Sequence, residues 1–459
     1  MNKTTKKLQQ FIIFGATGDL ASLMLFPALY ELFVQNQLPE NFQIIGYGRS
    51  AMPREEFLKK FEASVKNRSK QKLNKLEELL KKVEYFSGQY DQESDFRALD
   101  DFLKKMAKGK AREVIAYFSV PPVVFGPIVD NLAATVKKSA KKIKLVLEKP
   151  FGTDEKSAEK LLKEISRFYD QSDIYLLDHY LGKRPIQSIL KLRMENNVIN
   201  LMIKGQEISR ITILALEKND VGQRVGYYDQ VGAMKDMMQS HLLQILALIT
   251  MDIPVKADTE SLRREKSSIL SAVRFSGKAA DVVFAQYKSY QKLEGIVKNS
   301  KIDTYAELKL QIDRRDWYEV PVHLITGKKL DQDLTKVIIE FKKMPIQSAK
   351  AASNFLIFEI KPHELVKLAL IQRRTDFKNA KVEAYESVDL EQGLMCQTDF
   401  CLGPYASLIN DVILGEKRFF LSFEEILSAW KVIDKVEKVR SKSKLLYYED
   451  GSSGPKRQN

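Results

Sequence analysis

The chain has 459 residues, a length that suits two domains of ordinary size rather than one small module. Hydrophobic residues make up 44% of it and charged residues 29%, so it can bury a large core and is not disordered as a whole. Lysine and arginine number 74 against 60 aspartates and glutamates, so the net charge of +14 favours anionic partners.

Several other classes of protein are disfavoured. An apolar run of about 18 residues is missing, so we expect no membrane-spanning helix and no membrane partner. The start of the chain leads directly into an apolar strand pattern without the features of a signal peptide. Two cysteines, Cys396 and Cys401, are too few for a disulfide framework or a cysteine-rich zinc module and fit a reducing, cytoplasmic compartment. The lysines are spread along predicted helices without a nucleic-acid motif, so we expect no nucleic-acid partner.

The first part of the chain alternates strands with helices. Strands are predicted at 10–14, 42–47, 83–86, 114–118, 144–147 and 174–177, and helices at 20–34, 54–82 and 154–168. Strands that are separated by helices imply crossover connections and a parallel sheet covered on both faces. The sequence therefore predicts an α/β domain over residues 1–183.

The pattern changes after about residue 184. A strand-rich stretch at 207–217 precedes a long helix at 231–250, and further strands are predicted at 282–287, 306–312 and 337–341. Many strands with few helices indicate an α+β domain with a large, mostly antiparallel sheet, which we expect over 184–440. Residues 441–459 are polar and rich in Gly and Ser, which predicts a flexible C-terminal tail.

A candidate dinucleotide-binding turn lies between the first strand and the first helix. It comprises Gly15, Ala16, Thr17, Gly18, Asp19 and Leu20. The glycines allow a tight turn, and backbone N–H groups at the positive helix N-terminus can approach a pyrophosphate, as in Rossmann-like domains. Only two glycines are present, so a purely structural turn remains an alternative.

The end of the second strand indicates which nucleotide is bound. NAD-binding domains place an acidic residue there for the ribose 2′-hydroxyl. This chain has Arg49 followed by Ser50 instead, and a guanidinium suits a 2′-phosphate. Arg49 could also be an ordinary surface arginine, but its position favours NADP.

Three further segments place ionisable groups at strand ends or within one helix. Lys149 follows the strand at 144–147, and Asp178-His179-Tyr180-Leu181-Gly182-Lys183 follows the next strand, at the edge where parallel sheets bind ligands. His241 lies in the predicted long helix, five residues after Asp236. The chain has four histidines, and two of them fall in these segments. A lone histidine is more often structural, but this coincidence of positions favours a functional role.

These motifs, in this order, resemble those of the glucose-6-phosphate dehydrogenase family over nearly the whole chain. The matching runs are Gly-Ala-Thr-Gly-Asp-Leu-Ala from Gly15, Glu-Lys-Pro-Phe-Gly from Glu148, Asp-His-Tyr-Leu-Gly-Lys from Asp178 and Gln-Ser-His-Leu-Leu-Gln from Gln239. Further matches are Pro121-Pro122, Thr326-Gly327-Lys328 and Ala429-Trp430.

The resemblance implies oxidation of C1 of glucose 6-phosphate with reduction of NADP, in a homodimer or dimer of dimers assembled through the large sheet. It makes His241 the base that removes the C1 hydroxyl proton and Asp178 the residue that orients its ring. No metal is expected. It implies that substrate is bound by Lys149, which also contacts the cofactor, and by His179, Tyr180, Lys183, Glu217, Asp236 and Lys328.

The chain also departs from the family pattern. Ser22-Leu23-Met24 and Phe125 replace residues that support cofactor binding in the family. Asp333 stands five residues after Lys328, where the family has a second basic residue, and Glu359 and Lys361 replace the usual arginine and glutamine. Lys361 could restore the charge lost at Asp333. These changes predict weaker substrate binding and leave two alternatives: a catalytically weakened homologue with a binding or regulatory role, or a dehydrogenase of another sugar.

Overall fold

The computed structural model describes residues 8–222, 225–344, 352–375, 383–393 and 401–456, with the backbone alone at 372–375 and 383–388. The chain divides into two compact units. Unit 1 comprises Met1–Lys183 and Thr398–Phe423, and unit 2 comprises Arg184–Gln397 and Glu424–Asn459. Within the described residues, no helix has the length and apolar character needed to cross a membrane.

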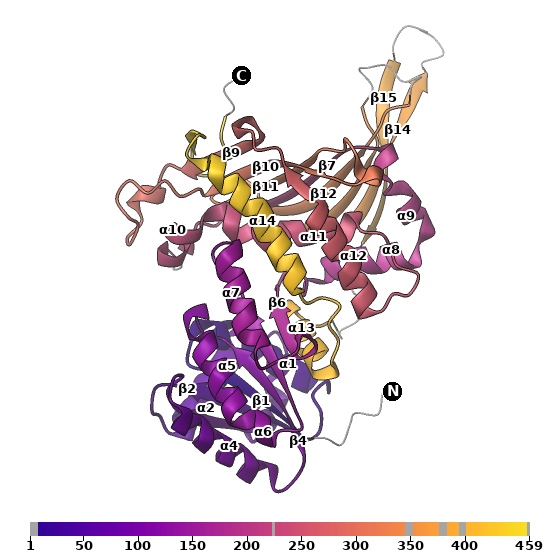
Figure 1. The fold of residues 1–459 in the computed structure, drawn as a ribbon. Coiled ribbons are helices and arrows are strands. Elements are labelled where there is room, and N and C mark those ends of the chain that lie inside the picture. Colours follow the sequence, from indigo (N-terminus) through magenta and orange to yellow (C-terminus); the bar gives the residue numbers. More distant parts are fainter. Residues whose placement is uncertain (1–7, 223–224, 345–351, 376–382, 394–400, 457–459) are drawn as a thin grey trace. The chain divides into compact units, whose positions relative to one another are not determined.

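Unit 1 contains a parallel sheet of six strands in the order β3-β2-β1-β4-β5-β6 (Figure 1). This order is that of doubly wound dinucleotide-binding domains. All seven residues of the central strand β1 are buried, as expected for a strand with helices on both faces. The predicted α/β fold is confirmed, with strands β1 Leu8–Phe14, β2 Phe42–Gly48, β3 Val83–Ser87, β4 Arg112–Phe118, β5 Lys142–Glu148 and β6 Ile174–Leu177.

The helices of unit 1 follow its strands along the chain. They are η1 Ala21–Leu25, α1 Phe26–Val34, α2 Arg54–Arg68, η2 Leu73–Lys75, α3 Leu76–Leu80, α4 Glu93–Ala107, η3 Pro122–Val124, α5 Phe125–Ala134, α6 Val136–Ser139, α7 Glu155–Ser166, η4 Gln171–Asp173 and α13 Pro404–Leu414. The single helix predicted over 54–82 is wrong, because α2 ends at Arg68. Residues 66–72 are all polar, so this stretch has no apolar face to pack against the sheet.

A late segment of the chain belongs to unit 1 rather than to a continuous domain over 184–440. Helix α13 buries Leu408, Ile409 and Val412. Leu421 forms an antiparallel bridge with Leu176 of β6. Its backbone N–H donates to the backbone oxygen of Leu176 at 3.0 Å. The segment completes the edge of the parallel sheet, a long-range pairing that local patterns do not indicate.

Unit 2 contains a sheet of ten strands among the described residues, in the order β15-β14-β13-β12-β7-β11-β10-β9-β16, with β8 paired to β10. Its pairs are antiparallel except β7 with β11 and β9 with β16. The predicted large, mostly antiparallel sheet is therefore confirmed. Its strands are β7 Ile208–Leu216, β8 Val273–Phe275, β9 Val282–Tyr287, β10 Tyr305–Ile312, β11 Val322–Gly327, β12 Leu334–Phe341, β13 Phe355–Lys361, β14 Leu365–Thr375, β15 Glu383–Gly393 and β16 Leu445–Tyr448.

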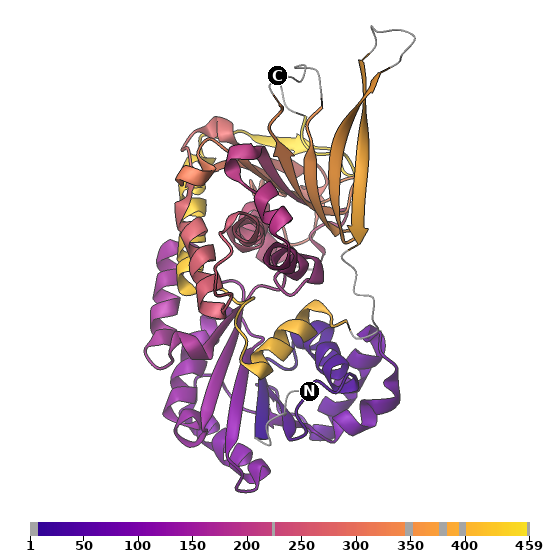
Figure 2. The ribbon, with the colours of Figure 1, turned by 90° about the vertical axis from the view of Figure 1, so that its right-hand side faces the viewer.

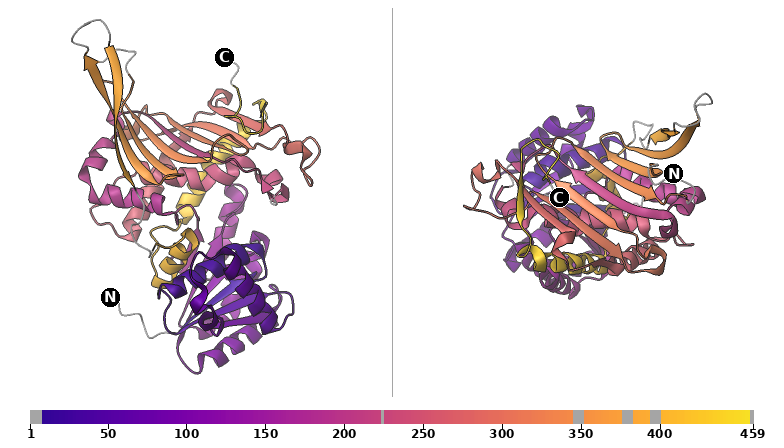
Figure 3. Two further views of the ribbon diagram at one scale, coloured as in Figure 1. Left: turned by 180° about the vertical axis from the view of Figure 1, so that it is seen from behind. Right: turned by 90° about the horizontal axis from the view of Figure 1, so that it is seen from above.

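The helices of unit 2 gather on one face of this sheet (Figure 2), and the view from above shows the strands of the other face uncovered (Figure 3). The longer helices are α8 Arg184–Glu195, α9 Asn197–Met202, α10 Val225–Ala233, η7 Met234–Leu242, α11 Leu243–Thr250, α12 Thr259–Ala272 and α14 Phe423–Arg440. Short 3-10 turns lie at η5 Gly205–Glu207, η8 Ala279–Asp281, η9 Tyr290–Lys292 and η10 Arg315–Trp317.

The expected flexible tail is wrong for residues 445–448. They form β16, which pairs with β9 at the edge of the sheet. Tyr448 is buried, and its hydroxyl donates to the backbone oxygen of Lys328 at 2.6 Å. The short run Leu445–Tyr448 is apolar, and burying apolar surface stabilises the strand. The sequence analysis missed it because the residues around it are polar.

The cysteines give a further difference from expectation. Cys401 is disulfide-bonded, and Cys396 lies outside the described residues.

The helix predicted at 231–250 is interrupted at Gly232. This residue has φ 72° and ψ 171°, a conformation that is strained for residues with a Cβ. Beyond it, Asp303 accepts backbone hydrogen bonds from Ala233 at 2.9 Å through its main chain and from Met234 at 2.8 Å through its carboxylate. Arg440 in turn pairs with the Asp303 carboxylate at 2.8 Å. Gly232 and Asp303 therefore fix where η7 begins.

We expect Gly232→Ala to lower the stability of unit 2 by about 3 kcal/mol, because the added Cβ is strained and lies 2.5 Å from Asp303 Oδ1. Gly277→Ala is the matched control, since Gly277 also has positive φ (80°) but its Cβ would meet open space, and it should cost only about 1 kcal/mol. Denaturant unfolding measures both. Equal losses would show that the contact with Asp303 does not matter.

Candidate active site

The predicted phosphate-binding turn follows β1 and leads into η1 and α1. Gly15 has φ 81°, and a Cβ on it would collide with the backbone oxygen of Ser119. Gly15 and Ala16 donate to the backbone oxygen of Tyr47 at 2.9 and 3.1 Å, which ties the turn to β2. A Cβ on Gly18 would lie 3.3 Å from the oxygen of Gly15. Only glycine fits the first position, and the turn presents the start of a helix, so its geometry fits a dinucleotide phosphate.

Arg49 is exposed just beyond β2, as the sequence predicts. Its guanidinium carbon lies 5.7 Å from the centroid of the Tyr90 ring. Among the described residues, no carboxylate forms an ion pair with Arg49, so its cation is available for an anionic ligand. The sequence analysis missed Tyr90, although it follows β3, the strand beside β2, and so lies at the ligand-binding edge of a parallel sheet.

Lys149 follows β5 directly, at the same edge of the sheet. Its neighbour Glu148 is buried and accepts a hydrogen bond of 2.5 Å from the hydroxyl of Tyr117. The pKa of Glu148 is raised to about 7, chiefly by burial; the Tyr117 hydrogen bond opposes this rise, the negative charge of Asp178 adds to it and Lys149 opposes it. Glu148 was absent from the predicted site, although it begins the Glu-Lys-Pro-Phe-Gly run. It is a carboxyl that can change protonation near neutral pH.

The segment after β6 forms a compact series of turns. The backbone N–H of Tyr180 donates to Asp178 Oδ1 at 2.9 Å, and that of Lys183 donates to the Tyr180 oxygen at 2.9 Å. Lys183 Nζ lies 3.4 Å from the centroid of the Tyr180 ring. The ring of His179 stacks near Tyr405 of α13, with centroids 6.3 Å apart and planes 9° from parallel. Unit 1 thus brings together the three side chains predicted to hold the phosphate, and Tyr405, which the sequence analysis missed, supports one of them.

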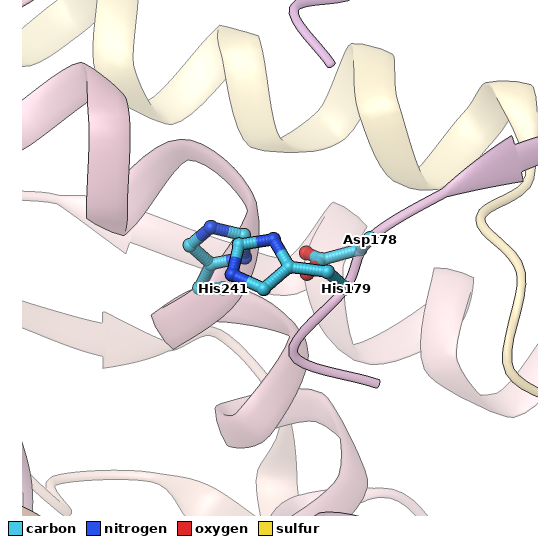
Figure 4. A group of neighbouring side chains, drawn as sticks. All are labelled: Asp178, His179 and His241. Carbon is cyan, nitrogen blue, oxygen red and sulfur yellow. The ribbon is translucent and has the colours of Figure 1, made fainter. Parts of the chain in front are cut away.

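Figure 4 shows the elements that carry three of the candidate residues: Asp178 and His179 come directly after β6, and His241 lies on η7. Asp178 and His241 are both buried, with 0% and 3% of their surface exposed. Buried ionisable groups are costly unless hydrogen-bonded or functional, which distinguishes these two from surface residues.

Within unit 2, Glu217 and Lys328 form an ion pair. Glu217 follows β7 and Lys328 follows β11, and these are parallel neighbours whose last residues, Leu216 and Gly327, are in register. Lys328 is buried, and Glu217 is partly exposed. The structure therefore joins two residues that the sequence predicted separately.

Tyr228 belongs to α10, the helix that directly precedes η7. Lys328 Nζ is 5.6 Å from the centroid of its ring. Burial raises the pKa of Tyr228 well above its ordinary value, and the charges of Asp236 and Asp303 raise it further. Asp236 is thus in electrostatic range of the same ring. The Tyr228 hydroxyl is buried and has no hydrogen-bond partner among the described residues, which makes Tyr228 a further candidate that the sequence analysis missed.

The departures from the expected pattern all take part in ion pairs. Lys361 pairs with Asp333 at 2.5 Å, and Lys336 pairs with Glu359 at 2.7 Å. Nδ1 of His363 also lies 2.6 Å from Glu359. Lys361 therefore neutralises Asp333, but it does not add the positive charge that an arginine or lysine would supply at Asp333.

Comparison with known proteins gives a consistent family match. Residues 12–188 match the family model "Glucose-6-phosphate dehydrogenase, NAD binding domain", and residues 190–459 match "Glucose-6-phosphate dehydrogenase, C-terminal domain". The chain is 31% identical to glucose-6-phosphate 1-dehydrogenase of Schizosaccharomyces pombe, over 99% of this chain and 93% of the relative. It is 32% identical to glucose-6-phosphate 1-dehydrogenase 5, cytoplasmic, of Arabidopsis thaliana, over 97% and 89%.

Solved structures agree with this match. A glucose-6-phosphate dehydrogenase in complex with glucose 6-phosphate superposes with a TM-score of 0.89 at 26% identity, covering 99% of this chain and 97% of the other. The enzyme from Mycobacterium avium gives 0.85 at 28% identity, covering 98% and 96%. The transcriptional regulator Gal80p gives 0.52 at 15% identity and covers 95% and 90%, which is a likeness of fold alone.

The raised pKa of Glu148 makes stability depend on pH. Its pKa is about 7 in the folded protein against an ordinary 4.5, so the folded state binds more protons between these values and the stability contributed by this group falls as pH rises through them. Glu148→Gln removes the cost of burying an ionised carboxylate. It should therefore stabilise the protein by up to about 3 kcal/mol more at pH 8 than at pH 4.5.

Thermal unfolding of wild type and Glu148→Gln at pH 5 and pH 8 tests this prediction. Glu159→Gln is the control, because Glu159 is exposed on α7 and Lys163 lowers its pKa. The control should show no gain in stability at the higher pH. If the difference between Glu148→Gln and wild type is the same at both pH values, Glu148 does not titrate in this range.

Proposed function

The chain belongs to the glucose-6-phosphate dehydrogenase family, and we propose that the residues placed above carry out the reaction of that family. The reaction is the oxidation of D-glucose 6-phosphate to 6-phospho-D-glucono-1,5-lactone with reduction of NADP. The observation that supports it most is the family match over both units, within which all the predicted motif residues are present. The ion pair Glu217–Lys328 and the Asp178–Lys183 turns add physical support.

Unit 1 supplies the groups that fit NADP. The turn from Gly15 to Leu20 would hold the pyrophosphate through backbone N–H groups at a helix start. Arg49, exposed and without an acidic partner among the described residues, would hold the 2′-phosphate. When bound, NADP supplies the hydride acceptor for C1 of the sugar. Lys149, at the end of β5, would donate hydrogen bonds to both the nucleotide and a sugar hydroxyl.

The C1 hydroxyl must lose its proton as hydride leaves C1, and we assign this step to His241. Imidazole accepts a proton efficiently near neutral pH, and His241 is positioned by a helix whose start is fixed by Gly232 and Asp303. Asp178 would hold the ring in the correct tautomer and stabilise the imidazolium that forms, as carboxylates do for other catalytic histidines.

The phosphate of the substrate needs donors and positive charge. His179, Tyr180 and Lys183 supply them from one series of turns, with Lys183 held over the Tyr180 ring. In unit 2, Glu217 and Asp236 would accept hydrogen bonds from sugar hydroxyls, while Lys328 would pair with Glu217 and donate to the sugar. The neutral Asp333–Lys361 pair supplies no net positive charge, so weaker substrate binding than in relatives with two cations remains our expectation.

An assay of NADPH formation tests the function and the alternatives. NADP with glucose 6-phosphate should give turnover, while NAD or unphosphorylated glucose should give much less. Equal turnover of glucose would show that the phosphate site is wrongly assigned and favour a dehydrogenase of another sugar. Absence of turnover with every pair would favour a weakened homologue with a binding or regulatory role.

His241→Asn should lower kcat by at least about 100-fold, because loss of a general base costs 10²–10⁴ in rate. The KM for glucose 6-phosphate should change little, since the phosphate groups lie on other residues. Steady-state kinetics and calorimetric binding of glucose 6-phosphate separate the two effects. A variant that loses binding but keeps kcat would show that His241 binds substrate and does not act as the base.

We propose a homodimer or dimer of dimers that assembles through the uncovered face of the large sheet. Leu214, Ile325, Ile338, Phe355 and Ile357 are half-exposed on neighbouring strands. Cross-strand register places Leu214 beside Ile325 and Ile338 beside Ile357, so they share a face. An apolar sheet face of this kind is a typical interaction surface.

Ile357→Glu should raise the dissociation constant of the dimer by about 100-fold or more, because burial of an unpaired carboxylate is costly. Val255→Glu is the control, since Val255 is fully exposed on a loop outside the sheet. Sedimentation velocity over a concentration series measures both. Unchanged assembly of Ile357→Glu would exclude this face.

We further propose a domain division in which residues 1–183, together with helix α13, bind the nucleotide, while the rest binds the sugar and forms the dimer. The supporting observation is the grouping of the chain into two compact units. A cytoplasmic location is proposed as well. Relatives of similar identity include one named cytoplasmic and another named chloroplastic, so localisation by microscopy of the tagged protein is the test.

A further inference from the structure

We propose that Tyr90 is a positioning residue that holds Arg49 in place for the 2′-phosphate and thereby sets the preference for NADP over NAD. This inference rests on the proposed function and extends it to a residue outside the family-derived site. It concerns a ring that lies between the end of β3 and the end of β2, within unit 1.

The main chain of Tyr90 is fixed by hydrogen bonds around it. Gly88 donates to the backbone oxygen of Gly48 at 3.0 Å, and the Tyr47 hydroxyl donates to that of Gln89 at 2.8 Å. Asn131 of α5 donates through Nδ2 to the backbone oxygen of Tyr90 at 3.1 Å. The segment after β3 is therefore held against β2 and α5.

The ring of Tyr90 is equally restricted. Only 9% of the residue is exposed, and its ring stacks near that of Tyr47 at a centroid separation of 5.8 Å and an angle of 28°. At the hydroxyl end, burial raises the pKa of Tyr90, while the charge of Arg49 and a backbone hydrogen bond at Gly15 lower it. The side chain thus links the phosphate-binding turn to Arg49.

Arg49 itself is exposed. The Tyr90 ring lies 5.7 Å from its guanidinium carbon, and within the described part of the chain the Arg49 side chain forms no ion pair or side-chain hydrogen bond. The backbone of the next residue, Ser50, is held in place: its oxygen accepts a hydrogen bond of 2.6 Å from the Tyr85 hydroxyl. A flexible arginine loses conformational freedom when it binds phosphate, and a fixed ring beneath it reduces that loss. The contact also leaves the N–H donors free, whereas a carboxylate partner would occupy them.

The test is calorimetric binding of adenosine 2′,5′-bisphosphate and of adenosine 5′-monophosphate, which differ in the 2′-phosphate. Tyr90→Leu removes the ring and should weaken binding of the bisphosphate about fivefold while changing that of the monophosphate by less than about twofold. Tyr90→Phe keeps the ring and should retain most of the selectivity. Tyr90→Met is the second variant if Tyr90→Leu fails to fold.

Two controls accompany this series. Tyr169→Leu removes another buried tyrosine of unit 1, which has Lys137 Nζ 4.6 Å from its ring centroid, and should change neither affinity. Arg49→Ala should lose the preference for the bisphosphate, and adding Tyr90→Leu to it should cause no further loss, because the ring acts through the arginine.

The outcomes distinguish a failure of the role assigned to Arg49 from a failure of the role assigned to Tyr90. If the wild-type protein binds both nucleotides equally, the role of Arg49 in the proposed function is wrong, and the role of Tyr90 falls with it. If the wild type prefers the bisphosphate but Tyr90→Leu prefers it as strongly, only the inference on Tyr90 is overturned. Equal weakening of both ligands by Tyr90→Leu would also overturn it, because the ring would then support the nucleotide domain in general.

Discussion

Parallel pairing of strands determines where the charged groups of this protein meet. In unit 1, the carboxyl ends of β2, β5 and β6 share one edge, so Arg49, Lys149 and Asp178 follow strands that end together. Unit 2 has a mostly antiparallel sheet, yet β7 and β11 are parallel, and this exception places Glu217 beside Lys328. An antiparallel pairing would have put these two residues at opposite ends of the strands.

Tyrosine rings are the second common feature of the candidate site. Three cations assigned to ligand binding lie near a tyrosine: Arg49 near Tyr90, Lys183 near Tyr180 and Lys328 near Tyr228. A ring attracts a cation without supplying a competing negative charge, so it can fix the position of the cation and leave it attractive to a phosphate. A carboxylate partner also neutralises the cation, as Glu217 does for Lys328.

The sequence predicted the elements well where local patterns determine them. The six strands of unit 1 follow from apolar runs between helices, and the turn at Gly15 follows from its glycines. It could not indicate contacts that depend on distant pairing. Tyr405 reaches His179 because α13 returns to unit 1, and β16 forms because β9 offers an edge more than 150 residues earlier. The kink at Gly232 was also hidden, since an isolated glycine in a helical pattern is usually tolerated.

The substitutions at Asp333 and Lys361 have a physical consequence that neither residue has alone. A lone carboxylate repels a phosphate ester, whereas the Lys361–Asp333 pair at 2.5 Å is neutral. Its side chains remain 49% and 35% exposed, so water screens the attraction and separating them costs only about 1 kcal/mol or less. Lys361 can therefore move toward an anion at small cost, but Asp333 then remains unpaired. Under the proposed assignment, the positive charge for the substrate phosphate therefore comes mainly from Lys183 and its neighbours in unit 1.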